Sequence, residues 1–120
     1  YVSLFGAVQE AAAAALLESQ QCVNDLVKRY ESRRNTFIQG LREIGWDVTS
    51  PAGSFFAWLK VPKGYTSEQF SDLLLEKAHV VVAPGVGFGT YGEGYVRVGL
   101  LTDQERMREA VSRIKKLNLF

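Results

Sequence analysis

The stretch Gly85-Val-Gly-Phe-Gly-Thr-Tyr-Gly-Glu-Gly-Tyr-Val-Arg-Val-Gly-Leu100 begins as a glycine-rich segment and ends as a β-strand. Successive side chains of a strand point to opposite faces of its sheet. One face of this strand suits a hydrophobic core, since it carries Val96, Val98 and Leu100. The other face carries Tyr95, Arg97 and Gly99. The strand therefore presents a single arginine on the face turned away from the core.

Arg97 has two interpretations. Arginine is the side chain best shaped to hold a carboxylate by two parallel hydrogen bonds, and Gly99 leaves room beside the guanidinium. In the alternative interpretation, Arg97 is a solvated residue on the open face of an antiparallel sheet. The spacing of the residues leaves both interpretations open.

Size and composition predict one folded domain. The chain has 120 residues, of which 47% are hydrophobic, so it can bury a core and is not a disordered segment. Fourteen basic and thirteen acidic residues leave a net charge of +1, which provides no global basic field for nucleic acid. No apolar run approaches the roughly 20 residues that cross a bilayer, and the N-terminus lacks the basic leader of a signal peptide. The single cysteine, Cys22, indicates a reducing compartment, and we expect a cytoplasmic protein.

The first part of the chain is predicted to be helical. Ser3–Leu17 contains the alanine run Ala11–Ala15 and an apolar stripe of little bulk, which suits close packing on a surface that this chain does not supply. The chain opens at Tyr1 directly into this apolar segment, and we interpret it as a piece of a longer protein. We therefore divide it into residues 1–18, a helical segment that would pack on a missing large domain, and residues 19–120, a small domain.

A second, longer helix is predicted over Ser19–Ile44, ending at Gly45. Its apolar residues recur at steps of three and four: Val23, Leu26, Val27, Tyr30, Phe37, Ile38, Leu41 and Ile44.

Two strands should follow, Trp46–Thr49 and Ser54–Val61, with a turn at Pro51–Gly53 between them. In the second strand, one face carries Phe55, Ala57, Leu59 and Val61, and the other carries Phe56, Trp58 and Lys60. A strand that is apolar on both faces up to Lys60 is expected to be covered on both sides, at least at its start.

The remaining elements alternate between helix and strand. Thr66 and Gln69 form a predicted capping box at the start of a helix that runs to Ala78, and Val80–Ala83 is a predicted buried strand. A second predicted capping box spans Thr102–Glu105, ahead of a helix with a clean amphipathic stripe: Met107, Ala110, Val111, Ile114 and Leu117. The order α-α-β-β-α-β-β-α predicts an α+β fold with helices packed on a small mixed or antiparallel sheet.

Several motifs carry little weight. The segment Gly87–Gly92 satisfies the G-x-G-x-x-G pattern, but the dinucleotide fingerprint needs a helix to begin there, and a strand is predicted instead. His79 and Cys22 are each the only residue of their kind, which argues against a metal site or a Ser-His-Asp triad. We expect no metal ligand and no catalytic residue in this chain.

Three segments together resemble a known family. They are Pro51-Ala-Gly-Ser-Phe-Phe-Ala-Trp, Pro84-Gly-Val-Gly-Phe-Gly and Gly92-Glu-Gly-Tyr-Val-Arg-Val-Gly-Leu. In this order and at these separations they resemble the C-terminal small domain of pyridoxal-phosphate aminotransferases of the aspartate aminotransferase superfamily (class I/II, fold type I). The resemblance covers nearly all 120 residues, and it does not specify a substrate.

The resemblance implies roles for three residues. Arg97 would pair with the α-carboxylate of the amino acid substrate, and Gly53 and Phe55 would lie near the substrate at the rim of the pocket. It also implies a parent enzyme that moves an amino group between an amino acid and a 2-oxo acid, uses pyridoxal 5'-phosphate and forms a homodimer.

The chain departs from the family in one respect. None of its six lysines lies in the family's Ser-x-x-Lys setting, so the lysine that would bind the cofactor is expected in the large domain, outside this chain. We therefore expect this piece alone to be inactive, to bind no pyridoxal phosphate and to self-associate through residues 1–17.

Two alternatives remain open. The chain would be a freestanding small-molecule-binding or regulatory module, with Arg97 and the glycine-rich segment as an anion site. Alternatively, it would be part of a fold type I decarboxylase, lyase or acyltransferase, since small domains look alike across these reactions.

Overall fold

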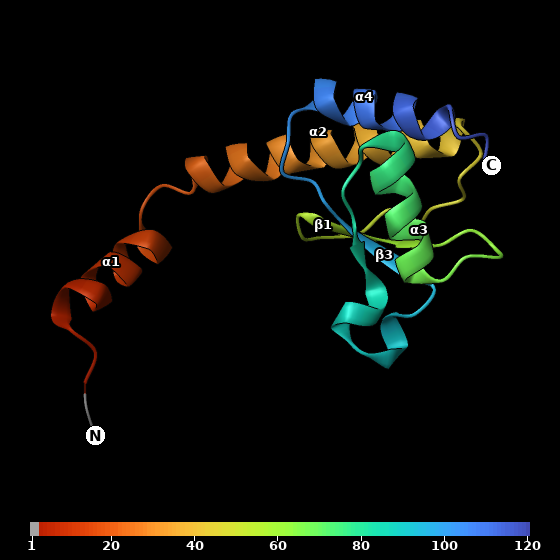
Figure 1. Ribbon diagram of the computed structural model, residues 1–120. Helices are drawn as coiled ribbons and strands as arrows, with labels where there is room; N and C mark the ends of the chain where they lie inside the picture. The colour runs from red at the N-terminus through yellow and green to blue at the C-terminus, as the bar shows by residue number, and fades with distance from the viewer. Residues whose placement is uncertain (1–2) are drawn as a thin grey trace.

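The computed structural model describes residues 3–120 as three helices packed on one face of a small sheet, with a further helix that extends away from this body (Figure 1). Tyr1 and Val2, which open the predicted N-terminal segment, lie outside the described residues. The helices are α1 (Gly6–Leu17), α2 (Gln21–Glu43), α3 (Ser67–Leu73), which continues as a π-helical turn over Leu74–Ala78, and α4 (Gln104–Lys115). The strands are β1 (Phe56–Lys60), β2 (Ala83–Pro84) and β3 (Tyr95–Gly99).

The sheet is antiparallel, with β3 at its centre in the order β1-β3-β2. Trp58 and Ala83 lie opposite Arg97 on the two neighbouring strands. Two further hydrogen bonds, from Val61 N to Gly94 O and from Leu100 N to Phe55 O, both 2.8 Å, extend the β1–β3 pairing at its two ends. The α+β class predicted from the sequence is confirmed.

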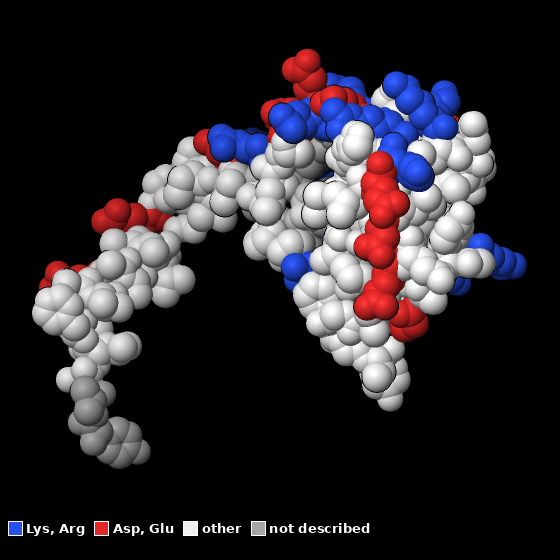
Figure 2. Space-filling model, viewed as in Figure 1, with Lys and Arg blue, Asp and Glu red and all other residues white. Residues whose placement is uncertain are grey.

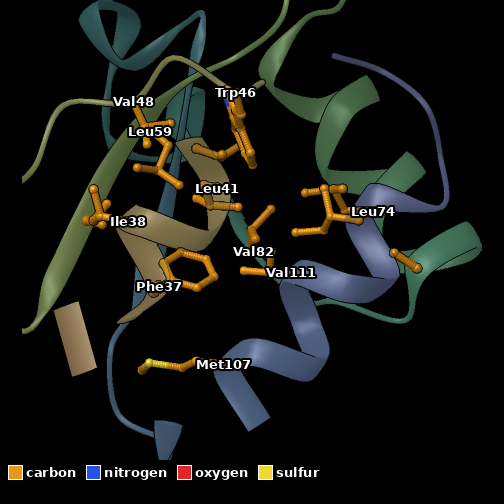
Figure 3. Packing of buried hydrophobic residues seen from close by; sticks show 14 of the residues in the cluster. Phe37, Ile38, Leu41, Trp46, Val48, Leu59, Leu74, Val82, Met107 and Val111 are labelled. Atoms are coloured by element: carbon orange, nitrogen blue, oxygen red, sulfur yellow. The ribbon is translucent and has the colours of Figure 1, made fainter. Parts of the chain in front are cut away.

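The core lies between the sheet and the helices α2, α3 and α4. Figure 3 shows Phe37, Ile38 and Leu41 of α2 packed with side chains of the other elements. The fully buried strand residues of this cluster are Ala57, Leu59 and Val96. The amphipathic stripe predicted for α4 is confirmed, because Met107, Val111 and Ile114 are all buried.

Helix ends follow the predicted chemistry with one exception. At the end of α2, Gly45 has a φ of 93°, and the amides of Gly45 and Trp46 donate to the carbonyls of Arg42 and Leu41, which is a Schellman motif. The Thr66–Gln69 capping box is present at α3. At α4 the cap is Asp103, whose carboxylate accepts from Arg106 N at 2.9 Å, so the box predicted to start at Thr102 was placed one residue early.

Two predicted strands are wrong or shortened. Residues 46–49 form no strand, because side chains hold this segment: Arg42 donates two bonds to Val48 O, and Trp46 Nε1 donates to Lys60 O. Of the strand predicted over residues 80–83, only Ala83 pairs in the sheet. The carbonyl of Val82 accepts from Ser71 Oγ at 2.8 Å instead of joining a ladder.

The expectation that the strand around residue 58 is covered on both sides is also wrong for the described part of the chain. Trp58 is 39% exposed and Phe56 is half-buried, because α2, α3 and α4 all lie on the other face. Phe55 was predicted to lie in the strand on the same face as Ala57 and Leu59, but it precedes the observed strand and is exposed.

Helix α1 has no buried residue. Several apolar side chains of α1, of the residue before it and of the first half of α2 are also exposed: Phe5, Val8, Leu16, Leu17, Val23, Leu26 and Val27. Figure 2 shows that the surface of this arm is mostly uncharged. No helix among residues 3–120 is both long and apolar enough to cross a membrane.

Candidate functional site

Arg97 occupies the middle of β3, next to the fully buried Val96 of the core, so its side chain lies on the opposite face of the sheet from the core. Its guanidinium lies between two aromatic rings: the Cζ atom is 4.2 Å from the ring centroid of Phe56 and 4.1 Å from that of Phe88. Both contacts are within the range of cation–π attraction. The two rings restrict the planar group and leave its N–H groups, which point outward in its plane, as the means of binding a partner.

The charge of Arg97 has no acidic partner among residues 3–120. The two ion pairs of this part of the chain join Arg34 to Glu31 and Arg113 to Glu109. Arg97 is half-buried, so a carboxylate that paired with it would replace water at a partly desolvated cation. This geometry favours a binding role over the alternative of a fully solvated arginine.

Aromatic rings extend from Arg97 in both directions. On one side, the ring centroids of Phe55 and Phe56 are 4.6 Å apart, and Tyr30 follows 5.9 Å from Phe55. On the other side, Trp58 lies 5.7 Å from Phe88 and 6.1 Å from Tyr95. The cation therefore sits in an aromatic row across the open face, where charge-assisted hydrogen bonds are less weakened by water than at a polar surface.

The glycine-rich segment forms two 3-10 turns, Gly85–Phe88 and Thr90–Gly92, that bring Phe88 over Arg97. Its ends touch: a Cβ atom on Gly92 would collide with the carbonyl of Gly85, and one on Gly85 with the carbonyl of Gly92. Gly89, between the turns, has a φ of 114°, which an L side chain rarely adopts. No α-helix begins in this segment, so it lacks the helix that the dinucleotide fingerprint requires.

Glu93 ties this segment to the start of α3. Its carboxylate accepts hydrogen bonds from Ser67 N and Ser67 Oγ, both 2.8 Å, and from Gly94 N at 3.0 Å. These donors, first the Ser67 amide and then the Ser67 hydroxyl, lower the pKa of Glu93 below its usual value. The sequence pointed to a helix start at Thr66, but a pairing with a carboxylate 26 positions away has no local signal.

Gly53 and Phe55 lie apart from the guanidinium of Arg97. They line a separate groove of about 410 Å³ whose other walls are Leu26, Val27, Tyr30, Glu31, Arg34, Ala52 and Ser54. The link to Arg97 runs through Phe55 and Phe56, whose rings are in contact and tilted by 47° to each other. The three residues predicted from the resemblance therefore border one aromatic row without meeting in one pocket.

Other candidate groups do not assemble into a reactive site. His79 is exposed at the end of the π-helical turn with a φ of 54°, and Cys22 is exposed on α2. Within residues 3–120, no three His, Cys, Asp or Glu side chains gather as metal ligands.

Pyridoxal phosphate needs a lysine for its covalent attachment, and the lysines of this chain do not fit that need. All six, Lys28, Lys60, Lys63, Lys77, Lys115 and Lys116, are exposed, and none borders the groove at Gly53 and Phe55. That the chain alone binds no cofactor stays a prediction.

Comparison with known proteins defines the class. The family model for aminotransferase class I and II matches residues 1–114, and the chain belongs to this family. Enzymes of this family transfer amino groups with pyridoxal phosphate.

The particular relatives are similar over 94% of the chain or more. It is 73% identical over 120 residues to the L-glutamine–4-(methylsulfanyl)-2-oxobutanoate aminotransferase of Bacillus subtilis, covering 100% of this chain and 30% of that protein. It is 42% identical over 113 residues to an LL-diaminopimelate aminotransferase of Moorella thermoacetica, covering 94% of this chain and 29% of that protein. Substrate-bound BacF of Bacillus subtilis has a similar structure, with a TM-score of 0.84 and 44% identity over 99% of this chain and 31% of that one. The chain thus spans about 30% of the length of the relatives that it matches.

Proposed function

We propose that this chain is the small, carboxylate-binding domain of an aminotransferase that moves an amino group between an amino acid and a 2-oxo acid. The observation that carries the proposal is the guanidinium of Arg97, held between Phe56 and Phe88 on an open sheet face with no acidic partner among residues 3–120. Both kinds of substrate have a carboxylate next to the reacting carbon, so one arginine can hold either of them.

The role of Arg97 is to position the substrate. Two parallel N–H···O bonds would fix the plane of the carboxylate, and thereby the direction of the bonds at the adjacent carbon. Phe56 and Phe88 limit rotation of the guanidinium, so they also fix the orientation of a carboxylate bound to it. Pyridoxal phosphate would supply the amino-group carrier, and because the lysines here do not fit it, its binding residues would come from the rest of the protein.

The first substrates to test are those named for the relative with 73% identity, glutamine and 4-(methylsulfanyl)-2-oxobutanoate. Gly53 and Phe55 are proposed to lie near the substrate, because their groove includes Tyr30 and Phe55, which belong to the aromatic row that contains Arg97. The homodimer and the cytoplasmic location expected from the sequence stay predictions. The relatives described above are all named as aminotransferases or transaminases, which favours this activity over a lyase or an acyltransferase of the same fold.

The test is Arg97→Lys in the full-length protein. Lysine keeps the charge but loses the forked geometry, and one charge-assisted hydrogen bond contributes about 1.5–3 kcal/mol. We expect kcat/KM for amino acids to fall about 10- to 150-fold, with Tm nearly unchanged. Arg97→Ala should lower kcat/KM for amino acids further than Arg97→Lys does.

The matched substrate is an amine with hydrogen in place of the α-carboxylate, measured in single-turnover half-reactions. The matched protein control is Arg106→Lys, an exposed arginine of α4. The amine should be nearly indifferent to Arg97→Lys. Unfolding of the variant, or unchanged turnover of amino acids, would show that Arg97 is structural or merely solvated.

A further inference from the structure

The placement of Phe88 decides how firmly the guanidinium of Arg97 is held. The other ring of the pair, Phe56, belongs to β1 and is fixed by the strand ladder opposite Gly99. Phe88 belongs to a 3-10 turn outside the sheet and is half exposed. The ladder fixes the two ends of this loop at Ala83–Pro84 and Tyr95, and leaves the tilt of the turn to other contacts.

A polar chain links this turn to the body of the domain. Ser67 is fully buried, and its hydroxyl donates to Glu93 Oε2 at 2.8 Å while it accepts from Val86 N at 3.4 Å. Val86 belongs to the 3-10 turn that carries Phe88, and its carbonyl accepts from Gly89 N at 3.0 Å. The carboxylate of Glu93 therefore orients the Ser67 hydroxyl, and that hydroxyl holds the amide two residues before Phe88.

We propose that Glu93 is a positioning residue for substrate binding. Through Ser67 and Val86 it holds Phe88 against Arg97, and this orients the N–H groups of the guanidinium toward the substrate carboxylate. The carboxylate of Glu93 accepts hydrogen bonds from Ser67 and Gly94, and its role is exerted through these contacts. The inference rests on the proposed carboxylate-binding role of Arg97. In it, the hydrogen bonds of the Glu93 carboxylate keep the glycine-rich segment ordered.

The decisive variant is Glu93→Gln in the full-length protein. An amide has one acceptor oxygen where the carboxylate has two, so the bonds from Ser67 and Gly94 cannot all be kept. We expect KM for amino acid and oxo acid substrates to rise about 5- to 20-fold, kcat to change less than 2-fold, and amide exchange over residues 85–94 to become faster. The amine without an α-carboxylate should react at the rate seen with the unsubstituted protein.

Two further variants serve as a control and as an independent test of the same contact. Glu76→Gln removes an exposed carboxylate that takes part in neither ion pair and should change neither KM nor exchange. Ser67→Ala keeps the backbone bond to Glu93 but removes the hydroxyl link to Val86; it should reproduce the rise in KM even if Glu93→Gln fails to fold.

Combining Glu93→Gln with Arg97→Lys separates this inference from the proposed function. If Glu93 acts through Arg97, the double variant should have nearly the KM of Arg97→Lys alone, because the two effects share one path. Multiplicative effects, equal losses for the amino acid and the amine, or kinetics and exchange like those of Glu76→Gln would each overturn the role of Glu93 alone. A result in which Arg97→Lys shows no preference between amino acid and amine would overturn the proposed function, and this inference with it.

Discussion

Arg97 is held from two sides by rings that come from different parts of the chain, a strand residue, Phe56, and a loop residue, Phe88. A cation between two aromatic faces keeps its charge but loses freedom to rotate. At partly exposed sites such a contact contributes about 0.5–1 kcal/mol for each ring. Each ring therefore contributes to the order of the guanidinium, and the nitrogen atoms at its edge would make the proposed bonds to a carboxylate.

Replacing Phe88 by leucine tests this contribution. Leucine keeps an apolar side chain but has no π-face, so we expect KM for carboxylate substrates to rise about 2- to 5-fold in the full-length protein, with Tm unchanged within about 1 °C. Tyr91→Leu is the matched control, since Tyr91 is an aromatic residue of the same loop and is 99% exposed. Equal effects of the two substitutions would contradict a specific role for Phe88.

At the scale of elements, the glycine-rich loop depends on a close approach of its two ends. Gly85 and Gly92 are buried against each other's carbonyl groups, where a side chain of any size would collide with backbone. The loop therefore has one compact form, and a methyl group at either glycine would force its ends apart.

We expect Gly92→Ala to destabilise the domain by about 1–3 kcal/mol, because the backbone must shift to admit the methyl group. Gly87→Ala is the matched control: a Cβ atom there has no neighbour within 4 Å and the residue has no positive φ. Thermal or urea denaturation of both variants measures the difference. Equal stability of the two variants would contradict this prediction, since it would show that the backbone at the loop ends moves apart at little cost in free energy.

The hydrogen bonds to the Glu93 carboxylate predict that the stability of the domain depends on pH. Hydrogen bonds from Ser67 and Gly94 lower the pKa of Glu93 in the folded protein, so its contribution to stability is present above the ordinary glutamate pKa and is lost as the pH falls through the lowered value. The difference in Tm between the unsubstituted chain and Glu93→Gln should be largest near neutral pH and shrink in acid. A constant difference from pH 7 to pH 3 would contradict this sign.

At the scale of the whole molecule, the chain measures 55 × 33 × 22 Å, and α1 with the first half of α2 forms its long arm. The arm exposes apolar side chains without a partner among residues 3–120, including Phe5, Leu16 and Leu17. Apolar patches of this kind drive association. The predicted division into residues 1–18 and 19–120 places most of this exposed surface in the first segment.

We expect the 120-residue chain to self-associate in solution, or else to show rapid amide exchange in α1. A shorter chain of residues 19–120 should associate less at the same concentration. Light scattering and amide exchange on both chains provide the measurement. A strict monomer with a strongly protected α1 would contradict the predicted division.

The sequence by itself determined what depends on neighbours along the chain. The ends of α2 and α3 follow from Gly45 and from the Thr66–Gln69 pair, and the position of Arg97 opposite the core follows from strand alternation. These features need only local dihedral angles, caps and periodicity. The three-segment resemblance added the family, which the comparison confirmed.

Only the tertiary structure decided what depends on contacts between distant residues. Arg42 and Ser71 take carbonyls of the predicted strands at residues 46–49 and 80–83, so these apolar stretches do not join the sheet in full. The rings that hold Arg97 and the bond from Ser67 to Glu93 join segments 9 to 41 residues apart. Periodicity and capping patterns do not predict such pairs, because one local pattern is compatible with many contact partners. Which partner a residue contacts depends on how the whole chain packs.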